Sequence, residues 1–287
     1  MNGEEEMSDR KAYPSDLTDK EWEILEPLIP AISPLAVEVK YTRREIVNGI
    51  LYVLRSGCPW RLVPHDLPAW GTLYDYFRTW RKDGIWDEVQ KSLLKRVRQK
   101  EGRNEEPSAA VIDSQSIKTS ATNGTEKGFD KGKLIWGRKR HVLVDTQGNL
   151  MEVKVTAASA SDLKGAKMLL EPLKALFPRM SLLWGDSHYG GTLIEWLDSQ
   201  LGWKVEIVHG LGTVPDADTE ASKHKGKSSK GGFKVLPRRW VVERSFAWIT
   251  RWRRLARDHE GLPESSEAFI KLSASRRMLS HIAPVAA

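Results

Sequence analysis

Residues 109–117 read AAVIDSQSI, and residues 181–190 read SLLWGDSHYG. In each stretch an apolar run typical of a buried strand reaches an aspartate and passes into small polar residues. Residues 139–158, KRHVLVDTQGNLMEVKVTAA, lie between the two and predict a pair of strands joined by a turn at Thr146–Gly148. The three segments together predict the core of a sheet.

Helical segments alternate with strands in the second half of the chain. A helix capped by Ser161 or Asp162 is expected to run to residue 178, and a second over 192–202 precedes a strand at 203–210. The order of three strands, helix, strand, helix, strand and helix is typical of an α/β fold in which helices flank a mixed sheet. A ribonuclease-H-like fold has this order, although several other α/β folds come close.

The rest of the chain divides into parts of different character. Residues 1–15 are expected to form a disordered acidic leader, and 16–105 a small all-helical N-terminal domain. The α/β domain follows at 108–282, and it contains a Gly-, Lys- and Ser-rich stretch at 210–236 that predicts a flexible basic insertion.

The composition limits the function classes. The chain has 287 residues, a formal net charge of +7 and a single cysteine, Cys58. A basic excess favours nucleic acid as a partner, although many basic proteins bind none. The first residues carry no apolar run of the secretory kind, no stretch is long and apolar enough for a membrane helix, and an intrachain disulfide is excluded. We therefore expect a cytoplasmic protein.

Within the helical domain, helices over 42–56 and 72–83 resemble a helix-turn-helix pair, which predicts a DNA-end-binding role. Aromatic residues recur at helical spacing on the second helix and are expected to be core residues rather than base-stacking ones. These residues are Tyr74, Phe77 and Trp80.

Asp113 and Asp186 each follow an apolar run, so both are expected at the carboxyl ends of strands, where α/β sheets present their sites. An aspartate in this position can equally cap a turn. Two such residues on separate strands, matched by a third carboxylate, favour a shared site.

Glu243 is the candidate for that third carboxylate. Residues 237–259 predict one continuous helix with an apolar arc and an arginine-rich polar arc around Glu243. The polar arc comprises Arg239, Glu243, Arg244, Thr250, Arg251, Arg254 and Arg257. A simple ion pair between Arg239 and Glu243 is the alternative, but it leaves the other arginines unexplained.

Three carboxylates suit hard divalent cations. Mg²⁺ and Mn²⁺ favour oxygen ligands, and two such ions can activate an attacking hydroxyl and stabilise a leaving oxygen. Neighbouring guanidinium groups can hold phosphate oxygens. The sequence therefore predicts phosphoryl chemistry at Asp113, Asp186 and Glu243.

With these residues in place, the chain resembles the insertion-sequence-five family of bacterial DDE transposases over almost its whole length. The matching stretches are DLTDKEWEILEPLIP, SGCPWRLVP, VIDSQSIKT, GRKRHVLVDTQG, GDSHYGG and FKVLPRRWVVERSFAWITRWRRLARDHE. The resemblance implies a ribonuclease-H-like catalytic core behind a helical N-terminal domain. It also implies that Asp113, Asp186 and Glu243 form the metal-binding triad, holding two Mg²⁺ or Mn²⁺ ions.

Two positions depart from the signature around the third acid. Arg239 and Glu243 fit its R-x3-E part, but Leu236 stands where related signatures have Tyr, and Thr250 where they have Lys. Arg251, next to Thr250, is the candidate substitute.

Phosphate contacts are predicted for two basic groups. Arg239, Arg251 and Arg254 lie on the predicted helix, while Arg138, Lys139, Arg140 and His141 begin a strand. A solvated basic strand end is the alternative for the second group.

We expect an enzyme that cleaves phosphodiester bonds at transposon ends and transfers the 3′-hydroxyl to target DNA. Its partners would be double-stranded terminal inverted repeats, target DNA and further copies of itself, in the bacterial nucleoid. The alternatives are a catalytically silent DNA-binding repressor derived from a transposase and a metal-dependent nuclease without strand transfer.

Overall fold

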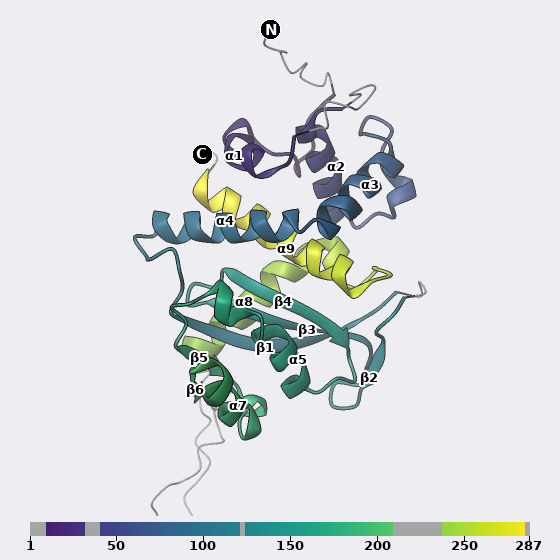
Figure 1. The fold of residues 1–287 in the computed structure, drawn as a ribbon. Helices are drawn as coiled ribbons and strands as arrows, with labels where there is room; N and C mark the ends of the chain where they lie inside the picture. Colours follow the sequence, from purple (N-terminus) through teal and green to yellow (C-terminus); the bar gives the residue numbers. More distant parts are fainter. Residues whose placement is uncertain (1–9, 32–40, 121–123, 209–236, 285–287) are drawn as a thin grey trace, which may run out of the picture.

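A helical region lies above an α/β region in the computed structural model, which describes residues 10–31, 41–120, 124–208 and 237–284 (Figure 1). Residues 1–9 of the predicted leader and the whole of the predicted basic insertion lie outside these residues. The predicted disorder is wrong for residues 10–15, because Arg10 pairs with Asp16 at 2.8 Å and Tyr13 donates to Asp66 at 3.0 Å. The helical region comprises α1 (Asp19–Leu25), α2 (Arg43–Ser56), α3 (Trp70–Lys82) and α4 (Ile85–Lys100), with short 3-10 turns at Glu26–Leu28 and Trp60–Leu62.

Local signals set the ends of these helices. Thr18 caps α1 through a capping box with Glu21, and the side chain of Thr42 caps α2. Gly57 ends α2 in the left-handed conformation, with φ 73°. On α3, Phe77 and Trp80 are core residues as expected, whereas Tyr74 is 41% exposed.

The sheet is built around β1 (Ala109–Lys118). It pairs antiparallel with β3 (Ile135–Asp145) on one side and parallel with β5 (Leu182–Gly185) on the other. Further strands are β4 (Leu150–Ala157), antiparallel to β3; β6 (Lys204–Ile207), parallel to β5; and β2 (Gly128–Asp130), which pairs with the first residues of β3. The order β4–β3–β1–β5–β6, with three antiparallel strands followed by two parallel to β1, is the ribonuclease-H-like arrangement expected from the sequence.

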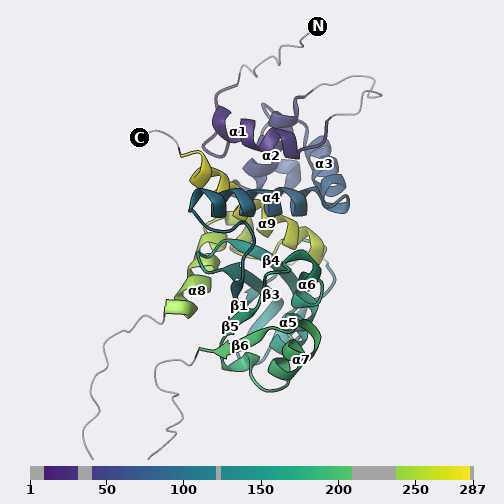
Figure 2. The same ribbon diagram turned by 60° about the vertical axis from the view of Figure 1, so that its left-hand side comes forward.

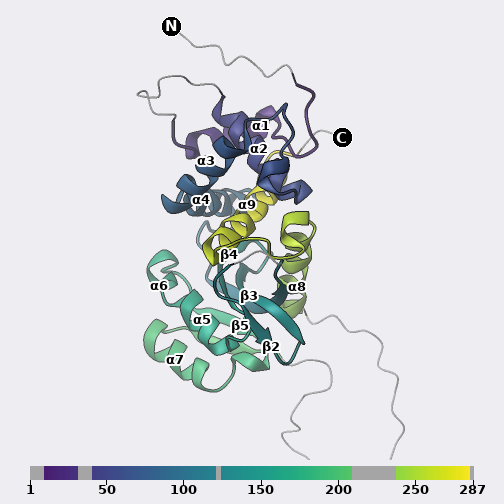
Figure 3. The same ribbon diagram turned by 90° about the vertical axis from the view of Figure 1, so that its right-hand side faces the viewer.

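Helices cover both faces of this sheet. α5 (Asp162–Leu170) lies on one face and α8 (Pro237–Thr250) on the other, as Figures 2 and 3 show. α6 (Leu173–Leu176) and α7 (Thr192–Leu201) follow on the α5 side. No helix in the described ranges could cross a membrane.

The C-terminal helix α9 (Pro263–Ile282) joins the two regions, since it packs on both α4 and β4. Its buried Lys271 is paired with Asp87 of α4 and, at 2.6 Å, with Glu152 of β4. The predicted boundary near residue 105 does separate the helical region from the α/β region along the chain. Buried residues of both regions nevertheless form one hydrophobic core.

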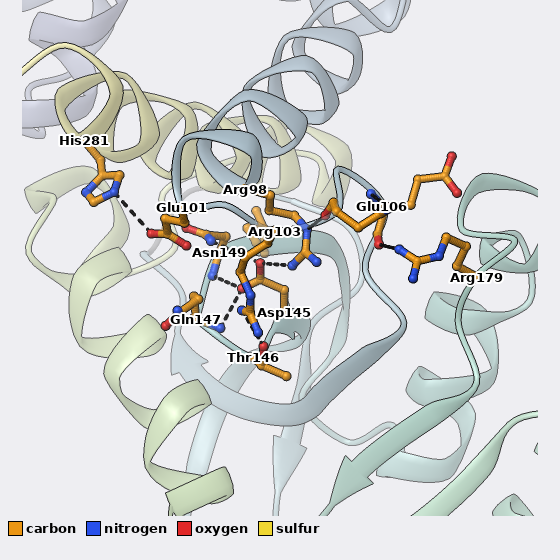
Figure 4. Close-up of polar contacts among 12 residues, drawn as sticks. Arg98, Glu101, Arg103, Glu106, Asp145, Thr146, Gln147, Asn149, Arg179 and His281 are labelled. Carbon is orange, nitrogen blue, oxygen red and sulfur yellow. Dashed lines mark hydrogen bonds and ion pairs between the residues drawn. The ribbon is translucent and has the colours of Figure 1, made fainter.

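A buried ion pair holds the end of α4 against the β3–β4 turn (Figure 4). Arg98 Nη1 lies 2.7 Å from Asp145 Oδ2, and Arg98 Nε donates to the carbonyl of Asn104 at 2.9 Å. Asp145 is fully buried and also accepts from the backbone N–H groups of Gln147 and Asn149, each at 2.9 Å. This pair fixes the direction in which the chain enters β1.

Asp145→Ala should lower the free energy of unfolding by about 3–5 kcal/mol, because it leaves the buried Arg98 guanidinium unpaired. Chemical denaturation measures the change. Adding Arg98→Met should restore part of the loss, since it removes the stranded charge. A double variant less stable than the single one would contradict this role for the pair.

Candidate active site

The pairing of β1 with β5 brings two aspartates together. Ala109 lies opposite Leu182 and Val111 opposite Trp184, so continuing the parallel register by two residues places Asp113 opposite Asp186. Adjacent strands lie about 4.8 Å apart. Both aspartates line one small hollow, together with Val242 of α8.

The aspartates also make local hydrogen bonds. Asp113 Oδ1 accepts from the backbone N–H of Ser114 at 2.7 Å. Asp186 Oδ1 accepts from the backbone N–H of His188 at 2.9 Å, and its Oδ2 lies 3.1 Å from His188 Nδ1. Asp186 thus caps the 3-10 turn Ser187–Tyr189, which is the alternative role for an aspartate at the end of a strand.

Glu243 lies on α8, next in sequence to the buried Val242 that lines the hollow, and its side chain is exposed. Two contacts fix this helix on the sheet. Ser245 Oγ donates to the carbonyl of Gly148 at 2.9 Å, and Arg244 donates to the carbonyl of Gln147 at 2.7 Å.

The donor chemistry of the three acids suits Mg²⁺ or Mn²⁺, since all are carboxylates. Asp113 and Asp186 lie side by side, as a shared cation requires. In the described ranges, however, no three His, Cys, Asp or Glu side chains are close enough together to hold a metal ion. The structure therefore brings two of the predicted ligands together and places the third on the neighbouring helix.

Tyr189 is a buried residue near the candidate site that the sequence analysis did not single out. Its side chain is 1% exposed, and its pKa is raised well above the usual value by burial and by the carboxylates of Asp113, Asp162 and Asp186. The 3-10 turn after Asp186 turns the chain back and buries this ring beside the acids. The sequence signal that could have indicated this burial is the aromatic ring of Tyr189 within an otherwise polar turn.

The predicted phosphate contacts of Arg138 and Arg140 are wrong for the protein as it stands, because both side chains are fully buried. Arg138 pairs with Asp258 at 3.2 Å and donates to the carbonyls of Thr125, Glu260 and Gly261. Arg140 donates to the carbonyl of Leu255 at 2.9 Å. Both arginines hold the 255–261 segment on the sheet.

Lys139 and His141 point to the opposite face, toward α5, and are also buried. Lys139 lies 3.2 Å from Asp162, and His141 Nε2 lies 3.0 Å from the hydroxyl of Thr156. The predicted phosphate contact is wrong for these two residues as well. The run of basic residues is an internal strand, which neither the solvated nor the phosphate-binding interpretation anticipated.

The predicted continuous helix over 237–259 is also wrong. α8 ends at Thr250, whose hydroxyl donates to the carbonyl of Phe246 at 3.0 Å, and Trp252 is extended, with φ −85° and ψ 120°. A 3-10 turn follows at Arg253–Leu255.

Arg254 therefore does not share a helical face with Glu243. Its guanidinium is buried, 2.7 Å from Glu260 and 2.9 Å from the carbonyl of Cys58, so it holds the helical region to the α/β region. Arg251 is exposed and its phosphate contact stays a prediction. The side chain of Arg239 lies outside the described residues.

Two aspartates lie at the ends of adjacent strands in a ribonuclease-H-like sheet, and the neighbouring helix α8 carries Glu243. This arrangement defines a class of nucleic-acid-cleaving enzymes. The comparisons agree with this class. Residues 104–276 match the family model of the transposase DDE domain, and residues 17–90 match that of a putative transposase of the IS4/5 family. The chain belongs to the DDE transposase family.

One relative and one solved structure show how far the similarity extends. The chain is 30% identical over 108 residues to the insertion element IS402 uncharacterized 16.2 kDa protein of Burkholderia cepacia, a match that covers 36% of this chain and 72% of that protein. The catalytic core domain of BIV integrase is 16% identical, with a TM-score of 0.30, over 58% of this chain and 80% of that chain. This second likeness is too low to add to the fold assignment.

The burial of His141 predicts a pH dependence of stability. Burial lowers the pKa of His141 from 6.5 to about 4, with a smaller opposing contribution from Asp162. Between these two pH values the unfolded chain binds the proton and the folded protein does not, so stability is lost as the pH falls from about 6.5 to 4.

His141→Gln should make the free energy of unfolding fall less steeply over this range than in the unmodified protein. Denaturation curves at a series of pH values measure the slope. Identical slopes in the two proteins would show that His141 does not titrate as its burial requires.

Proposed function

We propose that this transposase cleaves phosphodiester bonds at the ends of its element and transfers the freed 3′-hydroxyl to target DNA. The observation that carries the proposal is the placement of Asp113 beside Asp186 on parallel strands, with Val242 of α8 lining the same hollow. Glu243, next to Val242, completes the set of carboxylates.

In this proposal Asp113, Asp186 and Glu243 hold two Mg²⁺ or Mn²⁺ ions. When bound, the ions activate the attacking water or 3′-hydroxyl and stabilise the leaving oxygen. The chain's own contribution is to position the ligands. The β1–β5 register sets the spacing of the aspartates, and Ser245 and Arg244 fix α8, the helix that carries Glu243, against the β3–β4 turn.

Binding of the terminal inverted repeats is assigned to the helical region. α2 and α3 pack together across the 57–69 connection, and α3 exposes Tyr74, Arg78 and Lys82. A cleft of about 490 Å³ lies beside α3, where Arg78 and Arg81 face the 259–262 segment. Two ends must be brought together for transposition, so we expect a homo-oligomer on DNA in the bacterial nucleoid. The predicted flexible basic insertion at 210–236 lies outside the described residues.

Two other functions share this fold: a DNA-binding repressor without catalysis, and a nuclease without strand transfer. Incubation of the protein with terminal-repeat DNA and Mg²⁺ separates the three. Strand-transfer products support the transposase, nicks alone the nuclease, and a shifted but uncut band the repressor.

Asp186→Asn and Glu243→Gln should each abolish cleavage while leaving DNA affinity within about twofold, because each removes a metal ligand with little change of shape. Glu195→Gln on α7 is the matched control, since it removes an exposed carboxylate away from the hollow. A gel assay of nicked and joined products reads the outcome, and cleavage by either acid variant would overturn the triad.

Mg²⁺ should also raise the melting temperature of the unmodified protein by mass action, and that of Asp186→Asn much less. This second measurement distinguishes a metal ligand from a turn cap. If Asp186 only caps its turn, the variant loses roughly 1 kcal/mol without metal, and Mg²⁺ shifts both proteins equally.

Arg78→Ala with Lys82→Ala should weaken binding to terminal-repeat DNA. The slope of log affinity against log salt should fall by about 1 for each phosphate that the variant no longer neutralises. The control is Lys95→Ala, an exposed lysine on α4. An unchanged slope in the double variant would show that α3 does not contact DNA.

A further inference from the structure

A hairpin at the start of β3 exposes three large apolar side chains. It consists of β2, the turn 131–134 and the first residues of β3. Phe129 is 41% exposed, Leu134 75% and Trp136 60%, and Phe129 lies directly opposite Trp136 across the two strands. The part of the chain that the structure describes leaves this patch uncovered, and clustered exposed apolar side chains mark interaction sites.

The hairpin is held in a defined conformation. Asp130 Oδ1 accepts from the backbone N–H groups of Gly132 at 2.9 Å and Lys133 at 3.0 Å, which fixes the turn. Leu134 has φ 54°, a left-handed conformation that is unfavourable for a branched side chain. The chain therefore accepts local strain in a turn that leaves this leucine in solvent.

Polar contacts tie the hairpin to the residues that follow Asp113. Ser116 of β1 donates to Asp130, and Lys139 lies 3.9 Å from the same carboxylate. Lys139 also lies 3.2 Å from Asp162, which accepts from Ser114 at 2.7 Å. The apolar patch is thus held in a fixed position relative to Asp113.

The register places the patch on the same face of the sheet as Asp113. Val142 lies opposite Asp113, and side chains on a strand alternate, so Trp136 and its partner Phe129 point to that face. The six residues from Val142 to Trp136 span roughly 20 Å, the length of about six base pairs of DNA. Between Val142 and Trp136, the 255–261 segment covers Arg138, and Arg257 of this segment is exposed.

The charges select DNA as the occupant. Lys131 and Lys133 are exposed at the turn, on either side of Gly132, whereas Asp130 is already engaged by Ser116 and Lys139. A second copy of this chain would bring another formal charge of +7 against these lysines, which opposes self-association here.

We propose that the 128–136 hairpin is a wedge for the DNA being cleaved. Phe129, Leu134 and Trp136 contact a base step about six base pairs from the cleaved bond, and Lys131 and Lys133 contact the adjacent phosphates. Apolar side chains pressed between base pairs unstack and bend a duplex, which holds the strand at a defined angle. This inference rests on the proposed cleavage of transposon ends.

The test uses the full-length protein and duplexes that carry the end of its own element, with 2-aminopurine placed in turn four to eight base pairs from the cleaved bond. The unmodified protein should increase the fluorescence of the probe at one or two of these positions, because unstacking relieves quenching. Phe129→Ser with Trp136→Ser should abolish that increase and weaken binding about tenfold or more, the usual effect of losing one or two stacked side chains.

Leu176→Ser is the matched control, since Leu176 is a 42% exposed side chain on α6. It should behave like the unmodified protein, and unchanged thermal melts show that all variants fold. Lys131→Ala with Lys133→Ala should lower the salt slope and keep the fluorescence signal.

Three results with the double serine variant would overturn the wedge. The first is unchanged fluorescence and affinity, and the second is a loss of strand transfer while end cleavage stays normal. The third is a reduced oligomeric state, measured by sedimentation, while DNA contacts stay normal. If the unmodified protein itself neither binds nor cuts the end duplex, the proposed function fails instead. Failure of the wedge and failure of the proposed function are thus distinguishable.

Discussion

The double pairing of β1 is the constraint on which the rest of the structure depends. This strand hydrogen-bonds antiparallel to β3 and parallel to β5, and Ala110, Val111 and Ile112 are almost completely buried. A slip of one residue would move its apolar side chains to the opposite face, so the register is fixed. The same register sets Asp113 opposite Asp186 and orients the hairpin at the far end of β3.

The helical region is joined to this sheet through buried charges as well as apolar packing. Arg98 with Asp145, Lys271 with Glu152, and Arg254 with the carbonyl of Cys58 each cross from one region to the other. Breaking the Arg98–Asp145 pair leaves a buried charge unpaired, which costs more than the contact itself contributes. We infer that the helical region and the sheet keep a fixed relation, which the proposed positioning of a DNA end would require.

These buried charges also explain where basic residues were misinterpreted. Arg138 and Arg140 donate to carbonyl groups of the irregular 255–261 segment, and Arg254 donates to the carbonyl of Cys58, so each buried guanidinium satisfies a backbone acceptor. In a sequence, a guanidinium that binds a carbonyl cannot be told from one that binds a phosphate. Burial decides between the two, and burial depends on segments more than 100 residues apart.

The sequence by itself determined the order of strands and helices, the helix caps and the two aspartates at strand ends, because periodicity, capping and turn chemistry act over a few residues. It also carried the family resemblance that the comparisons confirmed. Only the tertiary structure decided that α8 ends at Thr250, that α9 packs on α4, and that no described segment covers Phe129 and Trp136. The physical reason is that these features depend on contacts between segments far apart in the sequence. The strength of such a contact depends on which side chains lie next to each other in the folded protein.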